Sequence, residues 1–276
     1  MNRVFDCFSF FNELDILEVR LNELNDVVDF FVLVEAKWTH QNKEKPLYYE
    51  LNKKRFAKFH SKIRHIILEE KPDFFYSFRK PKSWDFERYQ KDQIRRGLSN
   101  CDPEDIIILS DVDEIPNPLI LKSFKDFVGT HVFQQRIYHY FINCLEVEKD
   151  NQTRPNWWYG SVMTRFKNFK SAKKLRLLRE IHKYHGSVII PDAGWHFTSL
   201  GGVEKIIRKL ESFAHTEFNN PDFKDPNKIQ KLIENGESVF DQDIKCVFTE
   251  IDVSFPLYVQ NNREKLKNYI FKHSNV

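Results

Sequence analysis

The sequence predicts an α/β fold in which helices flank a mostly parallel central sheet. Two observations indicate this class. Short runs of β-branched and aromatic residues alternate with segments of helical hydrophobic spacing in the first half of the chain. The 276 residues also contain no linker rich in Gly, Ser or Pro and no internal repeat, so we expect one domain over residues 1–276.

Four apolar runs in the first half have the length and composition of buried strands: residues 4–11, 29–36, 63–68 and 105–110. Helices are expected between them, over 16–24 with Asn12 as the N-cap, near 53–62, and over 84–98, while 37–54 is mainly loop. An alternation of strand and helix is typical of parallel sheets, because parallel neighbours need a crossover connection.

The second half of the chain has a less regular pattern. Residues 133–142 and 187–191 have the composition of strands. Residues 202–218 have helical spacing, with Ile206, Ile207, Leu210 and Phe213 on one face. We expect these elements to complete the same domain.

The composition excludes several classes of protein. Hydrophobic residues make up 41% and charged residues 30%, which is typical of a globular chain and not of a disordered one. A net charge of +3 gives no support for nucleic-acid binding, and we expect none. The chain has only 8 glycines and lacks both GxGxxG and GxxxxGK[ST], so a bound nucleotide would not sit on a glycine-rich phosphate loop.

The cysteines and the apolar runs predict the compartment. Cys7, Cys101, Cys144 and Cys246 are scattered without metal-ligand spacing, which is typical of a reducing environment. Asp6 interrupts the N-terminal apolar segment too early for a signal peptide. No apolar run approaches the ~20 residues of a membrane helix. These features predict a soluble cytoplasmic protein, or one in a similar compartment, with no membrane span.

The segment 106–116 (IIILSDVDEIP) carries the most informative chemistry. A buried strand delivers Asp111 and Asp113 at its carboxyl end, the edge where open parallel sheets bind ligands. Two carboxylates on a short loop suit Mg²⁺ or Mn²⁺ bound together with the phosphates of a substrate. Such an ion would neutralise the charge that develops on a leaving phosphate.

An Asp-x-Asp pattern does not by itself identify a ligand site. A second one, Asp241 to Asp243, lacks a comparable preceding strand and indicates a solvated turn. Phosphatases with an aspartate nucleophile also place Asp-x-Asp after a strand, but there a glycine follows, where this chain has Glu114. The preceding strand favours a ligand site at Asp111 and Asp113, with the phosphatase as an alternative.

Several segments together resemble glycosyltransferase family 17, the family of the bisecting N-acetylglucosaminyltransferase. They are residues 10–24 (FFNELDILEVRLNEL), 29–36 (DFFVLVEA), 84–98, 105–118 (DIIILSDVDEIPNP) and 193–202 (AGWHFTSLGG). The resemblance implies a GT-A-like (Rossmann-like) fold, a nucleotide-sugar donor such as UDP-GlcNAc, a glycan acceptor, a divalent metal and inversion at the anomeric carbon. It also implies a division into a nucleotide-sugar-binding half, 1–118, and an acceptor-binding half, 119–276. The animal enzyme is a Golgi membrane protein, whereas this sequence shows no anchor.

Position and this resemblance together imply donor-binding residues besides Asp111. Glu35 ends the second strand at the same sheet edge, where it would reach a ribose or base. Arg88, Asp92 and Arg95 share one face of the helix before the Asp-x-Asp strand, and Arg88 is the expected phosphate or uracil contact. A solvated ion-paired face is the alternative for this helix.

Trp158 and Gly160 lie in an aromatic cluster, residues 156–161, that suits sugar binding, since aromatic rings pack on the C–H faces of sugars. Gly160 would let the backbone approach the ligand. An ordinary core cluster is the alternative for this segment.

His196 is the expected third metal ligand beside Asp111 and Asp113, because GT-A enzymes often complete the metal shell with a C-terminal histidine. An imidazole ligand favours Mn²⁺ over Mg²⁺. His182, His185 and His215 are its competitors.

Inversion requires a general base to take the proton from the acceptor hydroxyl. Asp192 is the first candidate for this catalytic role, and Glu217 with its neighbour His215 is the second. The prediction is therefore a metal-dependent glycosyltransferase. A non-catalytic carbohydrate-binding protein with the same fold is the alternative from another class.

Overall fold

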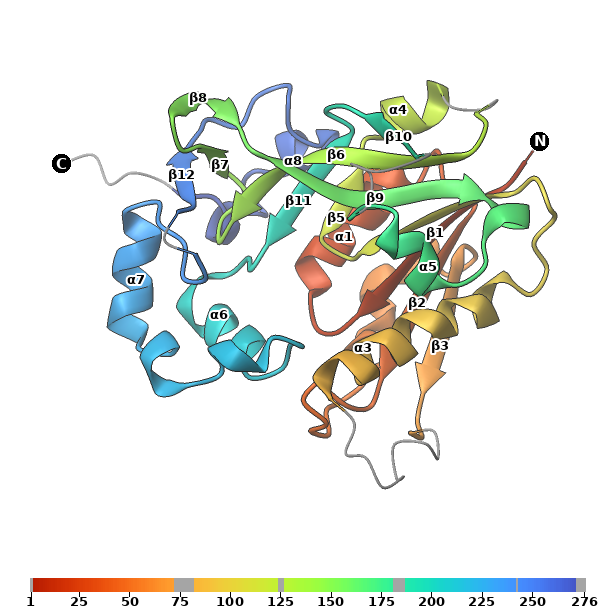
Figure 1. Cartoon of the computed structure of the whole chain (residues 1–276), viewed down its shortest axis with the longest axis horizontal. Coiled ribbons are helices and arrows are strands. Elements are labelled where there is room, and N and C mark those ends of the chain that lie inside the picture. The colour runs from red at the N-terminus through yellow and green to blue at the C-terminus, as the bar shows by residue number, and fades with distance from the viewer. Residues whose placement is uncertain (1, 72–81, 124–126, 181–186, 242, 272–276) are drawn as a thin grey trace.

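The computed structural model describes residues 2–71, 82–123, 127–180, 187–241 and 243–271. Within this part of the chain, twelve strands form one mixed sheet whose main path runs β12-β7-β6-β9-β4-β1-β2-β3 (Figure 1). The sheet is continuous across residue 118, because β4 from the first half pairs with β9 from the second.

The strands have the following bounds: β1 Val4–Phe10, β2 Phe30–Ala36, β3 Ile63–Leu68, β4 Ile106–Asp111, β5 Glu114–Pro116, β6 Thr130–His139, β7 Cys144–Glu148, β8 Asn151–Pro155, β9 Trp157–Arg165, β10 Ser187–Ile190, β11 Gly194–Thr198 and β12 Lys245–Phe248. The α-helices are α1 Leu14–Leu24, α2 Tyr48–Leu51, α3 Ser83–Asp92, α4 Pro118–Ser123, α5 Ala172–Leu177, α6 Gly202–Leu210, α7 Pro226–Glu234 and α8 Leu257–Asn261. Short 3₁₀ segments are η1 Lys53–Phe59, η3 Gln93–Leu98, η4 Phe166–Asn168, η5 Thr216–Phe218, η6 Pro221–Phe223 and η7 Lys267–Tyr269.

The first half builds the parallel part of the sheet. Strands β3, β2, β1 and β4 are parallel neighbours, so their carboxyl ends meet at one edge. The predicted α/β, GT-A-like class is confirmed, and in this half the sheet is parallel as expected. In the second half β6, β7, β8, β9 and β12 pair antiparallel, whereas β10 and β11 pair parallel with β6. Short connections join the antiparallel neighbours β6 and β7, and β7 and β8.

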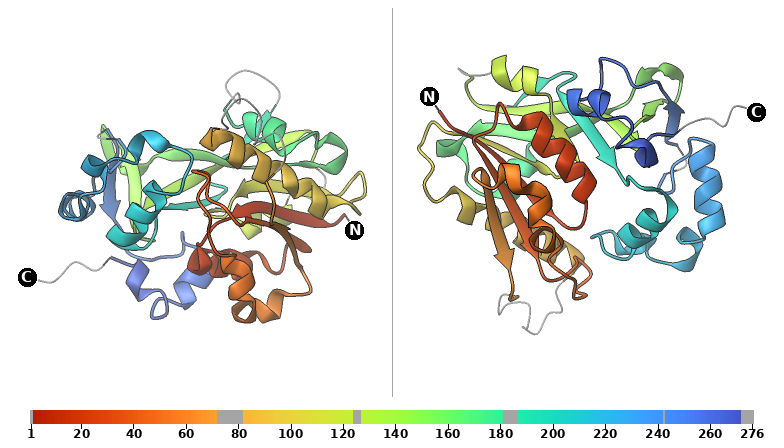
Figure 2. Two further views of the ribbon diagram at one scale, coloured as in Figure 1. Left: turned by 90° about the horizontal axis from the view of Figure 1, so that it is seen from below. Right: turned by 180° about the vertical axis from the view of Figure 1, so that it is seen from behind.

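The core lies on both faces of the parallel strands, because their side chains alternate with a period of two. In β2, Phe31 and Leu33 join the cluster that α1 and α8 cover, while Val32 and Val34 join the cluster that α3 and α5 cover. Figure 2 shows these helices on opposite sides of the sheet. Both faces are therefore apolar, which explains why these strands have continuous hydrophobic sequences.

Some predicted elements differ from the structure in length or type. The segment expected as a short basic helix is 3₁₀ over Lys53–Phe59, and the helix expected over 202–218 ends at Leu210. Glu13, not Asn12, occupies the N-cap position of α1. The reason is that the Glu13 carboxylate accepts hydrogen bonds from the backbone N–H groups of Phe11 and Asn12, which turns the chain before the helix begins.

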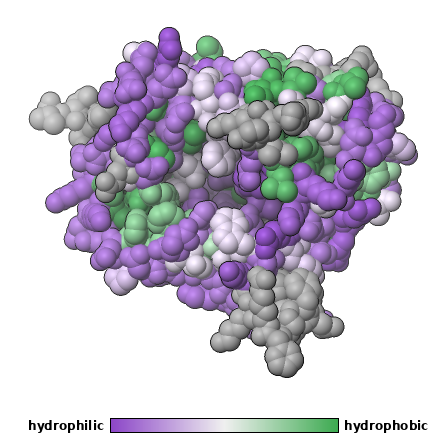
Figure 3. Space-filling view, viewed as in Figure 1, coloured by the Kyte–Doolittle hydropathy of each residue, from purple (hydrophilic) through white to green (hydrophobic). Residues whose placement is uncertain are grey.

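A smaller cluster of buried hydrophobic side chains lies beside the sheet. Ile206 and Leu210 of α6 pack with Ile229 and Ile233 of α7 and with Tyr140, which follows β6. Hydrophilic side chains cover most of the face that is seen in Figure 3. Helix α6 thus has an apolar anchor, and its Lys205 and Lys209 line the pocket described next.

Candidate active site

The Asp-x-Asp segment lies at the carboxyl edge of the parallel strands. Asp111 is the last residue of β4, and β5 begins at Glu114. Strand β5 pairs antiparallel with β11, which places His196 opposite Glu114. The backbone N–H of Phe197 donates a 2.9 Å hydrogen bond to the carbonyl oxygen of Asp113. Sequence positions more than 80 residues apart are therefore joined at this turn.

A fully buried arginine, Arg20, holds the Asp-x-Asp turn through its backbone carbonyl groups. Arg20 of α1 donates from Nη1 to the carbonyl oxygens of Asp111, Val112 and Glu114 at 2.9, 3.1 and 2.8 Å. Its Nε and Nη2 bind the Asp6 carboxylate at 2.7 and 2.6 Å. Because buried backbone carbonyls require partners, Arg20 satisfies three of them at once and sets the geometry of the loop.

Asp113 and His196 face each other, with Oδ2 of the carboxylate 3.6 Å from Nε2 of the imidazole. Both side chains are mostly buried, with 17% and 12% of their surface exposed. Although burial opposes the shift, the nearby His196 lowers the pKa of Asp113, so the carboxylate is ionised. The Nδ1 atom of His196 is buried and lacks a hydrogen-bond partner in the described part of the chain.

These two side chains fit a divalent cation as a pair of ligands. Carboxylate oxygen and imidazole nitrogen both bind Mn²⁺, and substrate phosphates and water would supply the remaining positions. The described residues contain no group of three or more His, Cys, Asp or Glu side chains that would enclose a metal without such help.

Asp111 is held by cations instead of joining this pair. Its Oδ1 lies 3.0 Å from Nζ of Lys91, and its Oδ2 accepts a 2.5 Å hydrogen bond from Arg176. Although burial opposes the shift, Arg176 and then Lys91 lower the pKa of Asp111 well below its usual value. The predicted set of three metal ligands is therefore not assembled, because both oxygens of Asp111 are already engaged by positive charge.

Glu114 links the turn to the aromatic side chain of Trp158, which was predicted to bind the donor. The fully buried Glu114 carboxylate accepts from Nε1 of Trp158 at 2.7 Å and from Arg179 at 2.9 Å. The Trp158 ring lies 4.9 Å from the His196 ring, at an angle of 31°. The structure thus brings Trp158 to the site, where it packs against the metal-ligand candidate His196.

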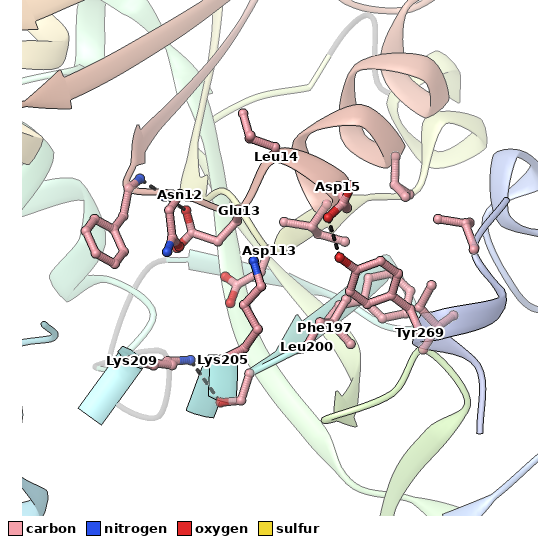
Figure 4. Close-up of a pocket in the computed structure, with 16 residues that line it drawn as sticks. Asn12, Glu13, Leu14, Asp15, Asp113, Phe197, Leu200, Lys205, Lys209 and Tyr269 are labelled. Atoms are coloured by element: carbon pink, nitrogen blue, oxygen red, sulfur yellow. Dashed lines mark hydrogen bonds between the residues drawn. The ribbon is translucent and has the colours of Figure 1, made fainter. Parts of the chain in front are cut away.

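A pocket opens next to Asp113. Its polar lining comes from Glu13 and Asp15 at the start of α1 and from Lys205 and Lys209 of α6. Figure 4 shows Glu13, Asp113 and Lys205 reaching into this space from three different segments. Burial, and to a smaller extent the Asp113 charge, raise the pKa of Glu13. This pocket is the concave space that the site offers to a ligand.

Three predicted donor-binding residues have other partners. Glu35 is fully buried and accepts from the Tyr49 backbone N–H at 3.0 Å and from His65 at 3.1 Å, so it stabilises the end of β2. Arg88 donates to Asp85 one turn earlier on α3. Asp92 accepts a 3.4 Å hydrogen bond from the Lys173 backbone. The structure places none of the three beside Asp113, because each is satisfied locally or by packing.

Gly160 has a packing role in place of the predicted approach to a ligand. A Cβ atom there would lie 2.0 Å from Oε1 of Gln135. That oxygen accepts from the Ser161 backbone N–H at 3.0 Å, while Nε2 of Gln135 donates to the Ile115 carbonyl at 3.1 Å. Gly160 makes room for the side chain that ties β5, β6 and β9 together.

Neither predicted general base reaches the pocket that Asp113 lines. Asp192 lies in the turn before β11, with φ of 47°, and both its oxygens bind Arg136, at 2.8 and 2.7 Å. Glu217 and His215 are hydrogen-bonded to each other at 2.7 Å and are about half exposed, beyond the end of α6. Two competitors for the metal, His182 and His185, lie outside the described residues.

The sequence reasoning missed several charged residues of the site. Lys91 could have been predicted from the sequence, because it lies three positions after Arg88 and therefore on the same face of the helix before the Asp-x-Asp strand. Arg20 could also have been predicted, because it is a charged residue inside the apolar face of α1. No sequence feature indicates Arg176, Arg179 or Glu13, since only the tertiary fold brings them to Asp111, Glu114 and Asp113. The site also draws on both halves of the chain, so the division at residue 118 does not separate its components.

Comparison with known proteins gives a family match. Residues 1–263 match the sequence model of glycosyltransferase family 17. The chain is also 26% identical over 264 residues to beta-1,4-mannosyl-glycoprotein 4-beta-N-acetylglucosaminyltransferase of Rattus norvegicus and of Homo sapiens. Each match covers 85% of this chain and 48% of the relative, so the chain spans about half the length of these relatives.

Solved structures also match this chain, at lower sequence identity. HddC from Yersinia pseudotuberculosis is 13% identical, with a TM-score of 0.39 and coverage of 70% of this chain and 91% of that one. Mannosyltransferase PcManGT from Pyrobaculum calidifontis, solved with GDP-Man and Mn²⁺, is 11% identical, with a TM-score of 0.38 and coverage of 76% and 61%.

The comparisons correct the predicted location. The mammalian relatives are named for transfer to a glycoprotein, a substrate of the secretory pathway, which contradicts the cytoplasmic location predicted from the scattered cysteines and the early Asp6. Those features are too indirect to fix a compartment. Among the helices of the described residues, none has the length and apolar character required to cross a membrane.

Proposed function

Because this chain belongs to glycosyltransferase family 17, we propose that it transfers a sugar from a nucleotide-sugar donor to a hydroxyl group of a glycan. The observation that carries the proposal is the Asp113–His196 pair at the carboxyl edge of the parallel strands, next to a cluster of three cations. UDP-GlcNAc is the proposed donor, since the mammalian relatives are named N-acetylglucosaminyltransferases.

Asp113 and His196 would hold Mn²⁺, or less favourably Mg²⁺, beside the donor diphosphate. The mixed oxygen and nitrogen donor set supports this order of preference. A bound divalent ion would supply a positive charge to the departing phosphate oxygens. Arg20 holds the carbonyl oxygens of Val112 and Glu114, on either side of Asp113, so the Asp113 carboxylate would need little reorganisation when the donor arrives.

The cations Lys91, Arg176 and Arg179 form the rest of the proposed donor site. In the structure they bind Asp111 and Glu114, and Arg176 keeps Nη1 buried without a hydrogen-bond partner in the described region. Guanidinium groups bind phosphate oxygens in a fixed geometry, so Arg176 is suited to the diphosphate. Asp111 would orient Lys91 and Arg176, Glu114 would orient Arg179, and Trp158 would orient His196.

The proposed reaction is a direct displacement with inversion. The acceptor hydroxyl oxygen attacks the anomeric carbon, the bond from that carbon to the phosphate oxygen breaks, and the nucleoside diphosphate leaves. The cations described above stabilise its charge.

An activity assay tests this proposal. The chain is incubated with UDP-GlcNAc, Mn²⁺ and octyl β-mannoside, UDP release is measured, and NMR determines the anomer of the product. Wild type is expected to release UDP and form the β-anomer, and Asp113→Ala to lose about 100-fold or more in rate. The control is Asp243→Ala, in the second Asp-x-Asp, where the aspartate is 77% exposed and pairs with Lys149. Equal rates in Asp113→Ala and Asp243→Ala would overturn the proposal.

A further inference from the structure

The pocket beside Asp113 is lined by three carboxylates that differ in their hydrogen-bond and ion-pair partners. Those of Asp15, Glu13 and Asp113 all line it. Asp15 accepts a 2.7 Å hydrogen bond from Arg55 and a further one from the Tyr269 hydroxyl, so its oxygens are occupied. Asp113 faces His196. Glu13 is the remaining carboxylate of the pocket.

Glu13 has one fixed oxygen and one available oxygen. Its Oε2 accepts from the backbone N–H groups of Phe11 and Asn12 at 3.1 and 2.9 Å. No hydrogen bond to Oε1 occurs among the described residues. Glu13 is the last residue of the short turn between β1, which ends at Phe10, and α1, which begins at Leu14, so the two elements fix its position. A carboxylate held in this way can accept a proton without reorganisation.

The rest of the lining suits a sugar. Phe197, Leu200 and Tyr269 provide apolar surface for C–H faces, and Lys205 and Lys209 provide donors for hydroxyl oxygens. Lys209 already donates to Thr198 and Ser199 at 3.0 and 3.2 Å. A pocket with mixed apolar and charged walls is typical of a site that orients a polar ligand.

We propose that Glu13 is the general base and that this pocket binds the acceptor, an inference that rests on the function proposed above. In the step, the acceptor O–H proton moves to Oε1 of Glu13 as the oxygen bonds to the anomeric carbon. The electron pair of the breaking carbon–oxygen bond leaves with the nucleoside diphosphate. Asp192 and Glu217 take no part in it.

The test compares Glu13→Gln with Glu23→Gln. Glu23 is a matched control because it also belongs to the α1 region, is partly buried, and accepts two backbone N–H groups, those of Leu257 and Tyr258, at 3.0 and 2.8 Å. UDP release from UDP-GlcNAc with Mn²⁺ is measured with water alone and with octyl β-mannoside as the nucleophile. UDP affinity with Mn²⁺ is measured by calorimetry on each variant.

We expect Glu13→Gln to lower the rate constant about 100-fold or more with unchanged UDP affinity, and Glu23→Gln to keep the wild-type rate. The 4-thio analogue of the acceptor, whose S–H group is more acidic, should lose less rate in Glu13→Gln than the hydroxyl acceptor does. If Glu13→Gln fails to fold, Glu13→Asp, which keeps the charge at a shorter reach, replaces it with the same prediction of lowered rate and unchanged UDP affinity.

Two outcomes would count against the inference in different ways. A rate within a few-fold of wild type in Glu13→Gln would overturn the role of Glu13 and leave the proposed function standing. No UDP release from wild type and from Glu23→Gln would overturn the proposed function, and this inference with it.

Discussion

Nε2 of His196 lies 3.6 Å from Oδ2 of Asp113, although more than 80 positions of the sequence separate the two residues. The antiparallel pairing of β5 with β11 produces this proximity, and a backbone hydrogen bond from Phe197 to Asp113 secures it. The proposed metal site would therefore have two protein ligands, and a bound donor would complete it.

Substitution of His196 tests this pair. We expect His196→Ala to lower Mn²⁺ affinity in the presence of UDP by about 10-fold or more, because losses of that size follow even from weaker perturbation of metal ligands. Calorimetry of Mn²⁺ binding measures the effect. His215→Ala is the control, since that histidine is exposed and bonded to Glu217. Equal losses in the two variants would contradict the assignment of His196.

Removal of the buried arginine should destabilise the fold. Arg20→Met leaves Asp6 buried without its partner and three carbonyl oxygens without a donor, so we expect a loss of about 3–5 kcal/mol in the free energy of unfolding. Urea denaturation gives the value. Lys149→Met removes an exposed ion pair to Asp243 and should stay within about 0.5 kcal/mol of wild type. A similarly small change in Arg20→Met would show that the turn does not depend on Arg20.

UDP affinity distinguishes Arg176, the proposed phosphate contact, from Arg88, the contact predicted from the sequence. Arg176→Gln should weaken UDP binding about 10-fold or more, because a hydrogen bond to a charged group contributes about 1.5–3 kcal/mol. Arg88→Gln should leave UDP affinity unchanged, since Arg88 pairs with Asp85 on its own helix. Calorimetric titration with UDP and Mn²⁺ measures both affinities. The reverse ranking would favour Arg88 as the phosphate contact.

A buried lysine should give the stability a distinctive pH dependence. Burial lowers the pKa of Lys45 to about 8, although Glu35 opposes the shift. The unfolded chain should keep the usual value of about 10.4. Between these pH values the unfolded state binds more protons, so this group makes the free energy of unfolding rise with pH.

Lys45→Met removes that contribution. Urea denaturation between pH 7 and pH 10, roughly the window of the shifted pKa, should show a smaller rise of stability with pH in the variant than in wild type. Lys37→Met, at a lysine that is 47% exposed, should keep the wild-type slope. An unchanged slope in Lys45→Met would mean that Lys45 is charged in the folded protein at these pH values.

The parallel half of the fold could be predicted because its signal is local. Strands β1, β2, β3 and β4 lie within one residue of the apolar runs that predict them. Strands β1, β2 and β4 are buried on both faces, which requires mostly hydrophobic sequence that is visible without knowledge of neighbours. The antiparallel strands are different. Strand β8 (NQTRP) is polar and exposed, and only pairing with β7 makes it a strand.

The residues of the candidate site also differ in how far the sequence could predict them. Asp113 was predicted from a strand end, His196 from the family resemblance and Trp158 from an aromatic cluster, and the structure brings the three together. Glu35 was predicted from its position at a strand end and Asp192 from its place beside the Gly-Trp-His segment, but ion pairs and backbone groups engage their oxygens. Position in a fold places a side chain near an edge, whereas its partners decide whether it is available to a ligand.

A thermal-unfolding titration tests the donor site most directly. Wild type and Asp113→Ala are heated with UDP-GlcNAc, other UDP- and GDP-sugars or UDP, each with and without Mn²⁺. A ligand at 100 times its Kd adds about 2.7 kcal/mol, so we expect wild type to gain roughly 5 °C with UDP-GlcNAc and Mn²⁺. The gain should vanish without Mn²⁺ and in Asp113→Ala. No gain with any nucleotide, or an equal gain in Asp113→Ala, would contradict a donor site built on Asp113 and His196.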